Sequence, residues 1–195
     1  MLVGILALQG DFFEHARTLD LINKDYRFIK TVDDLKDIDA IILPGGESTA
    51  IKIIQQNYNL FIKIKALIDE GIPTLGTCAG AILLSSNIIN DTTINLNVLD
   101  ITIKRNAYGR QNESFEANVS IDSLPKENYC FIRAPKIINI GENVTTIATL
   151  DKSPVGVRQK NIVAFTFHPE INASPIYLNW LTSFLDEGKN YVRSL

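Results

Sequence analysis

Three side chains of this sequence could act together as a nucleophile, a base and an acid: Cys78, His168 and Glu170. A thiolate attacks an electrophilic carbon, an imidazole takes the thiol proton, and a carboxylate holds the imidazole in the right tautomer. The chain has only two histidines, so few residues can serve as the base. The residue types therefore favour nucleophilic catalysis by a Cys-His-acid arrangement, provided that the fold brings the three together.

The residues around Cys78 predict a sharp turn between a strand and a helix. The apolar strand Ile72–Leu75 precedes it, and a new apolar run begins directly after it. Its neighbours Gly76, Ala79 and Gly80 are small enough for strained backbone at the apex. We expect the sulfur to project into solvent at the carboxyl edge of a sheet and at a helix N-terminus, which favours the thiolate. The alternative is a buried cysteine in a core turn, a common environment for free cysteine.

His168 follows the apolar run Ile162–Phe167, which reads as a strand, and Pro169 and Glu170 come next. In extended backbone, residues i and i+2 project to the same side, so we expect the His168 and Glu170 side chains to face one way together. The alternative is an ordinary histidine in a surface turn at the end of a strand. The presence of Cys78 on a nucleophile turn favours the catalytic interpretation.

The segment Pro44–Thr49 follows a predicted strand at Ala40–Leu43 and opens a predicted helix at about Thr49–Asn57. Its two glycines allow backbone N–H groups to point into a site, where they could stabilise an oxyanion. A rival interpretation takes the segment Gly46–Ala50 as a serine nucleophile turn. Because Ser48 is an ordinary residue for a helix N-cap, we expect Cys78 and not Ser48 to be the nucleophile.

The elements that must position these residues alternate between strand and helix. The apolar run Met1–Leu8 reads as a strand buried on both faces, a helix follows to about Asn23, and a second strand is expected near Tyr26–Ile29. This alternation predicts an α/β fold with a doubly wound, mostly parallel sheet flanked by helices, whose ligands lie at the carboxyl ends of the strands. We expect residues 1–195 to form a single domain.

Beyond about Ser86 the sequence predicts short strands that extend the sheet in antiparallel fashion and return His168 to the edge that holds Cys78. The predicted strands are Val98–Lys104, Phe115–Ile121, Tyr129–Ile132, Thr145–Leu150, Val155–Gln159 and Ile162–Phe167. A closing helix, capped by Asn172 or Ser174, is expected to pack on the core.

The composition excludes several classes of protein. The net charge of −3 gives no basic surface for nucleic acid. The sequence shows no leader segment and no apolar run long enough to span a membrane, and two cysteines suit a reduced compartment, so we expect a cytoplasmic protein. We expect no cofactor. We also expect no metal site, because two histidines and two dispersed cysteines cannot supply a closed ligand set without several carboxylates. We expect Cys130 in the core, without chemistry.

Several segments resemble known motifs. The segments Pro44–Thr49, Gly76–Gly80 and Phe167–Glu170 are similar to the three signatures of class I (triad) glutamine amidotransferases. Others resemble, more narrowly, the glutaminase subunits of pyridoxal 5′-phosphate synthase: Leu8–Gly10 with Glu14 and His15, Arg105–Gln111, Ser114–Glu116 and Phe131–Pro135. The resemblance extends from the first predicted strand to the last helix.

This resemblance implies hydrolysis of L-glutamine by Cys78, His168 and Glu170, with oxyanion donors around Gly46 and Ala79. It implies glutamine-binding roles for Gly46, Glu47, Ser48, Arg105, Ile132 and Arg133. A guanidinium and a carboxylate would complement the charges of a free amino acid. It also implies a partner, a (β/α)8-barrel synthase subunit in a large hetero-oligomer, which receives the ammonia to make pyridoxal 5′-phosphate.

Two alternatives stay open at this stage: a glutaminase of another class I pathway, such as imidazole glycerol phosphate synthesis, and a non-catalytic regulatory partner on the same scaffold. The segment Asp11–Phe13 departs from the family pattern and could alter docking of the partner. His15 carries the resemblance, but the sequence places no acid beside it and predicts no catalytic role.

Overall fold

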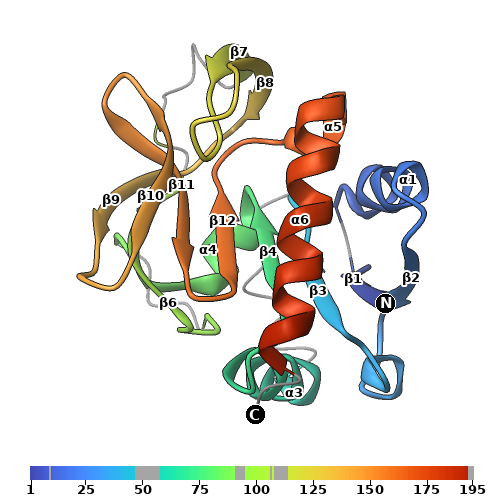
Figure 1. Ribbon diagram of the computed structural model, residues 1–195. Coiled ribbons are helices and arrows are strands. Elements are labelled where there is room, and N and C mark those ends of the chain that lie inside the picture. The colour runs from blue at the N-terminus through green and yellow to red at the C-terminus, as the bar shows by residue number, and fades with distance from the viewer. Residues whose placement is uncertain (9, 47–57, 91–94, 106, 108–113, 193–195) are drawn as a thin grey trace.

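A seven-stranded sheet forms the centre of the molecule, with the strand order β10-β11-β12-β4-β3-β1-β2 (Figure 1). The computed structural model describes residues 1–8, 10–46, 58–90, 95–105, 107 and 114–192. Five strands are parallel: β1 (Leu2–Leu6), β2 (Asp25–Ile29), β3 (Ala40–Leu43), β4 (Thr74–Thr77) and β12 (Ile162–Phe165). Two antiparallel strands, β10 (Thr145–Leu150) and β11 (Ser153–Gln159), complete one edge. The predicted fold class, a mostly parallel α/β sheet with an antiparallel extension, is confirmed.

The other strands form two smaller sheets, where the sequence predicted a continuation of the main one. One contains β5 (Ser85–Ile88), β6 (Leu99–Lys104) and β9 (Lys136–Ile140), and the other is the hairpin of β7 (Ser114–Val119) and β8 (Glu127–Ile132). The sequence predicted neither β5 nor β9. Strand β5 has the polar sequence SSNI and begins where a helix ends, so no apolar alternation marks it.

Helices cover both faces of the main sheet. One face carries α1 (Phe12–Leu21) and α6 (Pro175–Val192), and the other carries α3 (Tyr58–Asp69) and α4 (Ala79–Leu84). A 3₁₀ turn, η1 (Asp33–Leu35), precedes β3, and the short helix α5 (Pro169–Asn172) precedes α6. The predicted helix at about Thr49–Asn57 lies outside the described residues.

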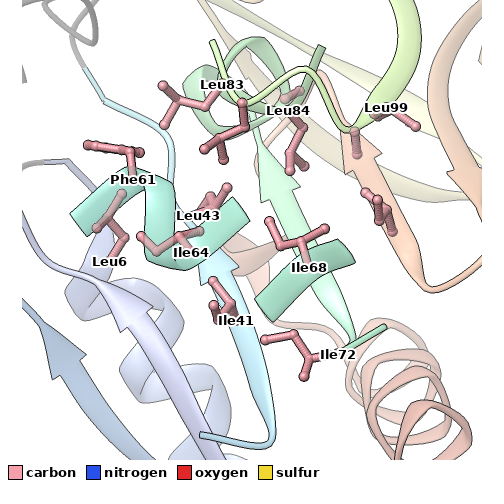
Figure 2. Close-up of a cluster of buried hydrophobic side chains, with 14 of the residues drawn as sticks. Leu6, Ile41, Leu43, Phe61, Ile64, Ile68, Ile72, Leu83, Leu84 and Leu99 are labelled. Atoms are coloured by element: carbon pink, nitrogen blue, oxygen red, sulfur yellow. The ribbon is translucent and has the colours of Figure 1, made fainter. Parts of the chain in front are cut away.

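Alternating side chains of the buried strands supply the two halves of the core. On β3, Ile41 and Leu43 face α3, while Ala40 and Ile42 face α1 and α6. Figure 2 shows three side chains of α3 directed at the sheet, namely Phe61, Ile64 and Ile68. The helix buries one stripe because its apolar residues recur at intervals of three and four.

Helix α6 lies across the strands on the opposite face (Figure 1). Its Trp180 ring lies 5.2 Å from the Phe165 ring and stacks on Phe184 at 5.4 Å. The Ser174 hydroxyl accepts a hydrogen bond from the Tyr177 N–H at 3.1 Å, so Ser174, one of the two predicted caps, caps this helix. Among the described residues, no helix is both long and apolar enough to cross a membrane.

Candidate active site

Cys78 stands at the apex of the predicted turn between β4 and α4. Its backbone has φ +49° and ψ −103°, a conformation that non-glycine residues rarely adopt. Its N–H donates to the carbonyl oxygen of Phe165 at 2.8 Å, which holds the apex against β12. The turn also needs Gly80, because a Cβ there would lie 1.9 Å from the Leu43 carbonyl oxygen. The predicted strand-turn-helix is therefore present, with strain at the cysteine.

The expectation that Cys78 projects into solvent is wrong, since the residue is only 6% exposed. The end of β8 lies beside it, and the carbonyl oxygen of Ile132 is 3.7 Å from the sulfur. Neither alternative of the sequence analysis therefore describes this residue in full. Cys78 is buried, yet it sits in strained backbone next to an ionisable partner, His168.

His168 reaches Cys78 because β12 pairs in parallel with β4, with Phe165 opposite Thr77. The His168 N–H donates to the carbonyl oxygen of Cys130 on β8 at 2.9 Å, which anchors its backbone from the other side. In the side chain, Nδ1 lies 2.8 Å from Glu170 Oε1. Because Nδ1 faces the carboxylate, the hydrogen bond between His168 and Cys78 falls to Nε2.

The predicted geometry of the His168 and Glu170 pair is wrong in one respect. The strand ends at Phe165, and Glu170 belongs to the helix α5, where extended backbone was expected. Pro169 explains the difference, because its fixed φ suits the first position of a helix. The helical turn still brings the carboxylate to the imidazole and places it in the interior, where Glu170 is 2% exposed.

The pKa values of His168, Glu170 and Asp11 are shifted by their surroundings. Burial alone would lower the pKa of His168, but hydrogen bonds to Cys78 and Glu170 outweigh it and raise that pKa to about 11. Burial would raise the pKa of Glu170, but His15 and His168 hold it below its usual value. The arrangement favours an imidazolium beside an ionised Glu170. Burial raises the pKa of Asp11, whose carboxylate lies 3.4 Å from His168 Nδ1.

The loop after β3 approaches the same imidazole. The Gly45 N–H donates to the Thr77 hydroxyl at 3.2 Å, and the Gly45 carbonyl oxygen accepts from the Asp11 N–H at 3.2 Å. A Cβ on Gly45 would lie 2.4 Å from His168 Cε1, so a larger residue would collide with the ring. The loop thus brings Gly46, a predicted oxyanion donor, close to the site. Glu47 and Ser48 lie outside the described residues.

The sequence did not predict the partners of His15. It is fully buried on α1, and its Nε2 lies 3.5 Å from Glu170 Oε1 and 3.1 Å from the Thr77 hydroxyl oxygen. Complete burial lowers the pKa of His15, and Glu170 offsets this only in part. The available signal was helical spacing, because His15 and the buried Leu19 are four residues apart on one face.

The other predicted binding residues lie on two different sheets. Ile132 ends β8, and Arg133 follows it with φ +44° and an exposed side chain, so this pair is adjacent to Cys78. Arg105 directly follows β6 in the three-stranded sheet. Ala79, the other predicted oxyanion donor, begins α4 directly after Cys78. Their contacts with glutamine stay predictions.

The second cysteine is not in the core as expected. Cys130 is partly exposed, with its sulfur 3.8 Å from Glu116 Oε1. Partial burial and the nearby Glu116 raise the pKa of its thiol, which disfavours the thiolate.

Among the described residues, three potential metal-ligating side chains converge, with ligand atoms within 4.8 Å of one another: Asp11, His168 and Glu170. The same His168 and Glu170 atoms already bond each other at 2.8 Å. A metal ion bound there would compete with that hydrogen bond.

The chain matches a known protein family. Residues 5–184 match the model of the SNO glutamine amidotransferase family. The chain belongs to this family. The resemblance to glutamine amidotransferases predicted from the motifs is therefore confirmed.

Curated relatives of this family are similar over most of the chain. The chain is 44% identical over 172 residues to "Pyridoxal 5'-phosphate synthase subunit PdxT" of Thermosipho africanus, covering 88% of this chain and 92% of the relative. It is 46% identical over 173 residues to the protein of the same name from Thermotoga petrophila, with the same coverage. A relative of that name from Caldicellulosiruptor bescii is 45% identical over 187 residues, covering 95% of this chain and 97% of the relative.

Solved structures agree with the fold. A crystal structure described as a glutamine amidotransferase superposes with a TM-score of 0.87 at 37% identity, covering 94% of this chain and 98% of the other. A putative GMP synthase subunit from Thermoplasma acidophilum superposes with a TM-score of 0.70 at 18% identity, covering 98% of this chain and 95% of that one. The second likeness concerns the fold alone.

Proposed function

We propose that this chain is the glutaminase subunit of a pyridoxal 5′-phosphate synthase and hydrolyses L-glutamine to L-glutamate and ammonia through Cys78, His168 and Glu170. The observation that carries the proposal is the linked arrangement of these three residues. His168 bonds Cys78 on one side and Glu170 on the other, the latter at 2.8 Å. The alternative of another class I pathway is not favoured, because the curated relatives share the name of one synthase subunit.

In the first half of the reaction, Cys78 Sγ attacks the side-chain amide carbon of glutamine, and backbone N–H groups around Gly46 and Ala79 stabilise the oxyanion. The raised pKa of His168 makes it an imidazolium, so it can give its Nε2 proton to the departing nitrogen. The C–N bond breaks, ammonia leaves, and a glutamyl thioester on Cys78 remains.

In the second half, the now neutral His168 takes a proton from water, and the resulting hydroxide adds to the thioester carbon. The C–S bond breaks, glutamate leaves, and the Cys78 thiolate and His168 imidazolium are restored. Glu170 keeps the imidazole oriented throughout, since its carboxylate stays bonded to Nδ1. Glu47, Ser48, Arg105, Ile132 and Arg133 are proposed to hold the amino acid end of glutamine.

The proposal includes a partner that uses the ammonia. The curated relatives are called subunits of pyridoxal 5′-phosphate synthase, which supports a complex with a synthase subunit. We propose that this subunit is a (β/α)8 barrel, that the assembly is a large hetero-oligomer, and that it is cytoplasmic. The two free cysteines are consistent with a reducing compartment.

The test is glutamate release from L-glutamine by the chain alone and with the synthase subunit from the same source. We expect release that rises with the synthase and is lost in Cys78→Ala. The matched control is Cys130→Ala, which removes the other thiol of the chain and should retain activity.

Release that is insensitive to the synthase would leave a glutaminase and assign it to another pathway. Release that survives in Cys78→Ala would overturn the mechanism. Trapping of a glutamyl adduct on Cys78, detected by mass spectrometry, would support the thioester directly.

A further inference from the structure

The Thr77 hydroxyl joins four elements beneath the candidate active site. It receives the Gly45 N–H at 3.2 Å from the loop after β3. It also lies 3.1 Å from His15 Nε2 on α1 and 3.4 Å from Glu170 Oε1 on α5, while Thr77 itself ends β4. Thr77 is fully buried, so no solvent competes for these bonds. No catalytic role assigned so far uses this hydroxyl or His15.

The chemistry of the partners fixes the direction of each hydrogen bond. The Gly45 N–H can only donate, and the ionised Glu170 carboxylate can only accept. Thr77 therefore accepts from Gly45 and donates to Glu170. His15 Nε2 faces two oxygens, so this nitrogen carries the proton and donates, whereas Nδ1 has no hydrogen-bond partner within the described residues. With one bond donated and two accepted, the hydroxyl is saturated.

The Glu170 carboxylate depends on these contacts for its position. Its Oε1 holds both the His168 Nδ1 and the Thr77 hydroxyl, whereas Oε2 has no hydrogen-bond partner in the described part of the chain. Without the Thr77 bond, the carboxylate could turn about its last torsion and weaken its bond to His168. A hydrogen bond to a charged group contributes enough free energy to shift a pKa by roughly one unit or more.

We propose that Thr77, with His15 behind it, is a positioning residue that holds the Glu170 carboxylate beneath His168 and ties it to the Gly45 loop. The proposal rests on the proposed glutaminase function for its kinetic consequence alone. Because the same hydroxyl bonds the Gly45 N–H, a displacement of that loop removes one of the contacts that orient it. The state of the loop that leads to the oxyanion donor Gly46 is thereby coupled to the acid of the triad.

A second buried threonine of the same strand shows what an ordinary structural role looks like. Thr74 is fully buried like Thr77, but its hydroxyl donates to the carbonyl oxygen of Ile72, two residues away, at 3.1 Å. That bond closes a local turn and touches no ionisable group. Thr74 is therefore a matched control on β4.

Other charged or ionisable groups face His168 and Glu170, and they remain unchanged in the variants described below. Five such groups act on His168 or Glu170: Asp11 in the turn between β1 and α1, Cys78 in the turn between β4 and α4, His15 on α1, Tyr177 on α6 and Cys130 on β8. A Thr77→Val substitution changes none of their charges and keeps the branched shape of the side chain. Any change in the titration of His168 then reports the lost hydroxyl.

The first test is an NMR titration of the folded chain labelled with ¹⁵N-histidine, which has only the two imidazoles of His15 and His168. In Thr77→Val we expect the pKa of His168 to fall by roughly one unit or more. Thr77→Ser, which keeps the hydroxyl, should return most of the shift, and Thr74→Val should leave it unchanged. An unchanged His168 titration in folded Thr77→Val would overturn the proposal.

The second test measures glutamate release by the same variants in complex with the synthase subunit. We expect kcat of Thr77→Val to fall roughly tenfold or more with little change in KM, because substrate contacts are intact. The alkaline limb of the pH profile should also move to lower pH, since a weaker carboxylate contact destabilises the imidazolium. Wild-type kinetics in Thr77→Val would refute the positioning role. An inactive wild-type complex would refute the proposed function and leave the NMR test to decide the positioning role.

Discussion

The chain has two histidines, both lie against the carboxylate of Glu170, and their pKa values are shifted in opposite directions. His168 Nδ1 is 2.8 Å from Glu170 Oε1 and its pKa rises to about 11. His15 Nε2 is 3.5 Å from the same oxygen, and burial lowers its pKa. One carboxylate thus stands between an imidazolium and a neutral imidazole.

The difference shows which partners a buried imidazole needs in order to stay protonated. Both imidazoles lose hydration, His15 at 0% and His168 at 2% exposure, so desolvation alone does not separate them. His168 has two strong partners, Cys78 and Glu170, whereas the nearest partner of His15 is the neutral Thr77 hydroxyl. Partners on both ring nitrogens overcome burial at His168. At His15, Nδ1 has no hydrogen-bond partner within the described residues, and the Glu170 carboxylate offsets burial only in part.

Replacing Glu170, which both histidines contact, should reduce the difference between their pKa values and cause the largest loss of activity. In Glu170→Gln, the pKa of His168 should fall toward its ordinary value, and kcat should fall roughly 10³-fold or more because the imidazole loses both charge support and orientation. Histidine NMR and steady-state glutamate release measure the two effects. The exposed Glu142→Gln serves as the control, and a near-normal kcat in Glu170→Gln would contradict the triad assignment.

A larger residue at Gly45 should disturb His168 and leave His15 unchanged. In Gly45→Ala, the new Cβ would lie 2.4 Å from His168 Cε1 and 2.9 Å from Asp11 Oδ2, so the ring or the loop must move. We expect kcat to fall roughly 100-fold, because small misplacements of catalytic groups cost about that much, while His15 keeps its titration.

The control for this variant is Gly141→Ala. It also creates a close contact, since its Cβ would lie 1.9 Å from Asp100 Oδ2. This contact lies in the loop after β9, outside the candidate site, so activity should persist there. Equal losses in the two variants would show that the Gly45 effect is general destabilisation.

The smallest effect is on stability, and the two histidines should act in different pH ranges. His15, whose pKa is lowered on folding, contributes stability that is lost as pH falls below about 6.5, where the unfolded chain takes up a proton that the folded chain does not. His168, whose pKa is raised, contributes stability that is present below about 6.5 and lost as pH rises toward about 11. Each slope is at most about 1.4 kcal/mol per pH unit.

Urea unfolding between pH 5.5 and 7.5 measures both slopes, because Glu170, Tyr177 and Cys130 titrate outside this range when unfolded. His15→Gln should flatten the acid side of the profile, and His168→Gln should flatten the alkaline side. The same flattening on both sides in either variant would mean that the two histidines do not titrate separately.

The sequence predicted most of the elements that build the site. The strand-turn-helix at Cys78 followed from its small neighbours, and the return of His168 to the same sheet edge was predicted. The prediction assigned that return to antiparallel strands, whereas β12 pairs in parallel with β4. These features depend on local sequence, since turn residues and apolar periodicity involve residues only a few positions apart.

What the sequence could not predict depends on tertiary contacts. The burial of Cys78 comes from β8, more than 50 positions later, whose Ile132 carbonyl covers the sulfur. The contact of His15 with Glu170 joins α1 to α5, and no local pattern specifies which carboxylate a buried histidine meets. The helix at Glu170 was missed because the apolar run before His168 suggested a longer strand than β12 forms.

The position of β12 has a consequence for how the chain folds. This strand is the last among the described residues, yet it lies between β4 and β11 inside the main sheet, and its Phe165 carbonyl receives the Cys78 N–H. Until residues 162–165 leave the ribosome, the side of β4 that β12 covers has no partner from the main sheet, and an unpaired edge invites aggregation. Pairing across such a sequence separation is slow, so we expect the nucleophile turn to be completed late in folding. A nascent chain that lacks β12 would therefore carry the cysteine without the backbone bond that holds its turn.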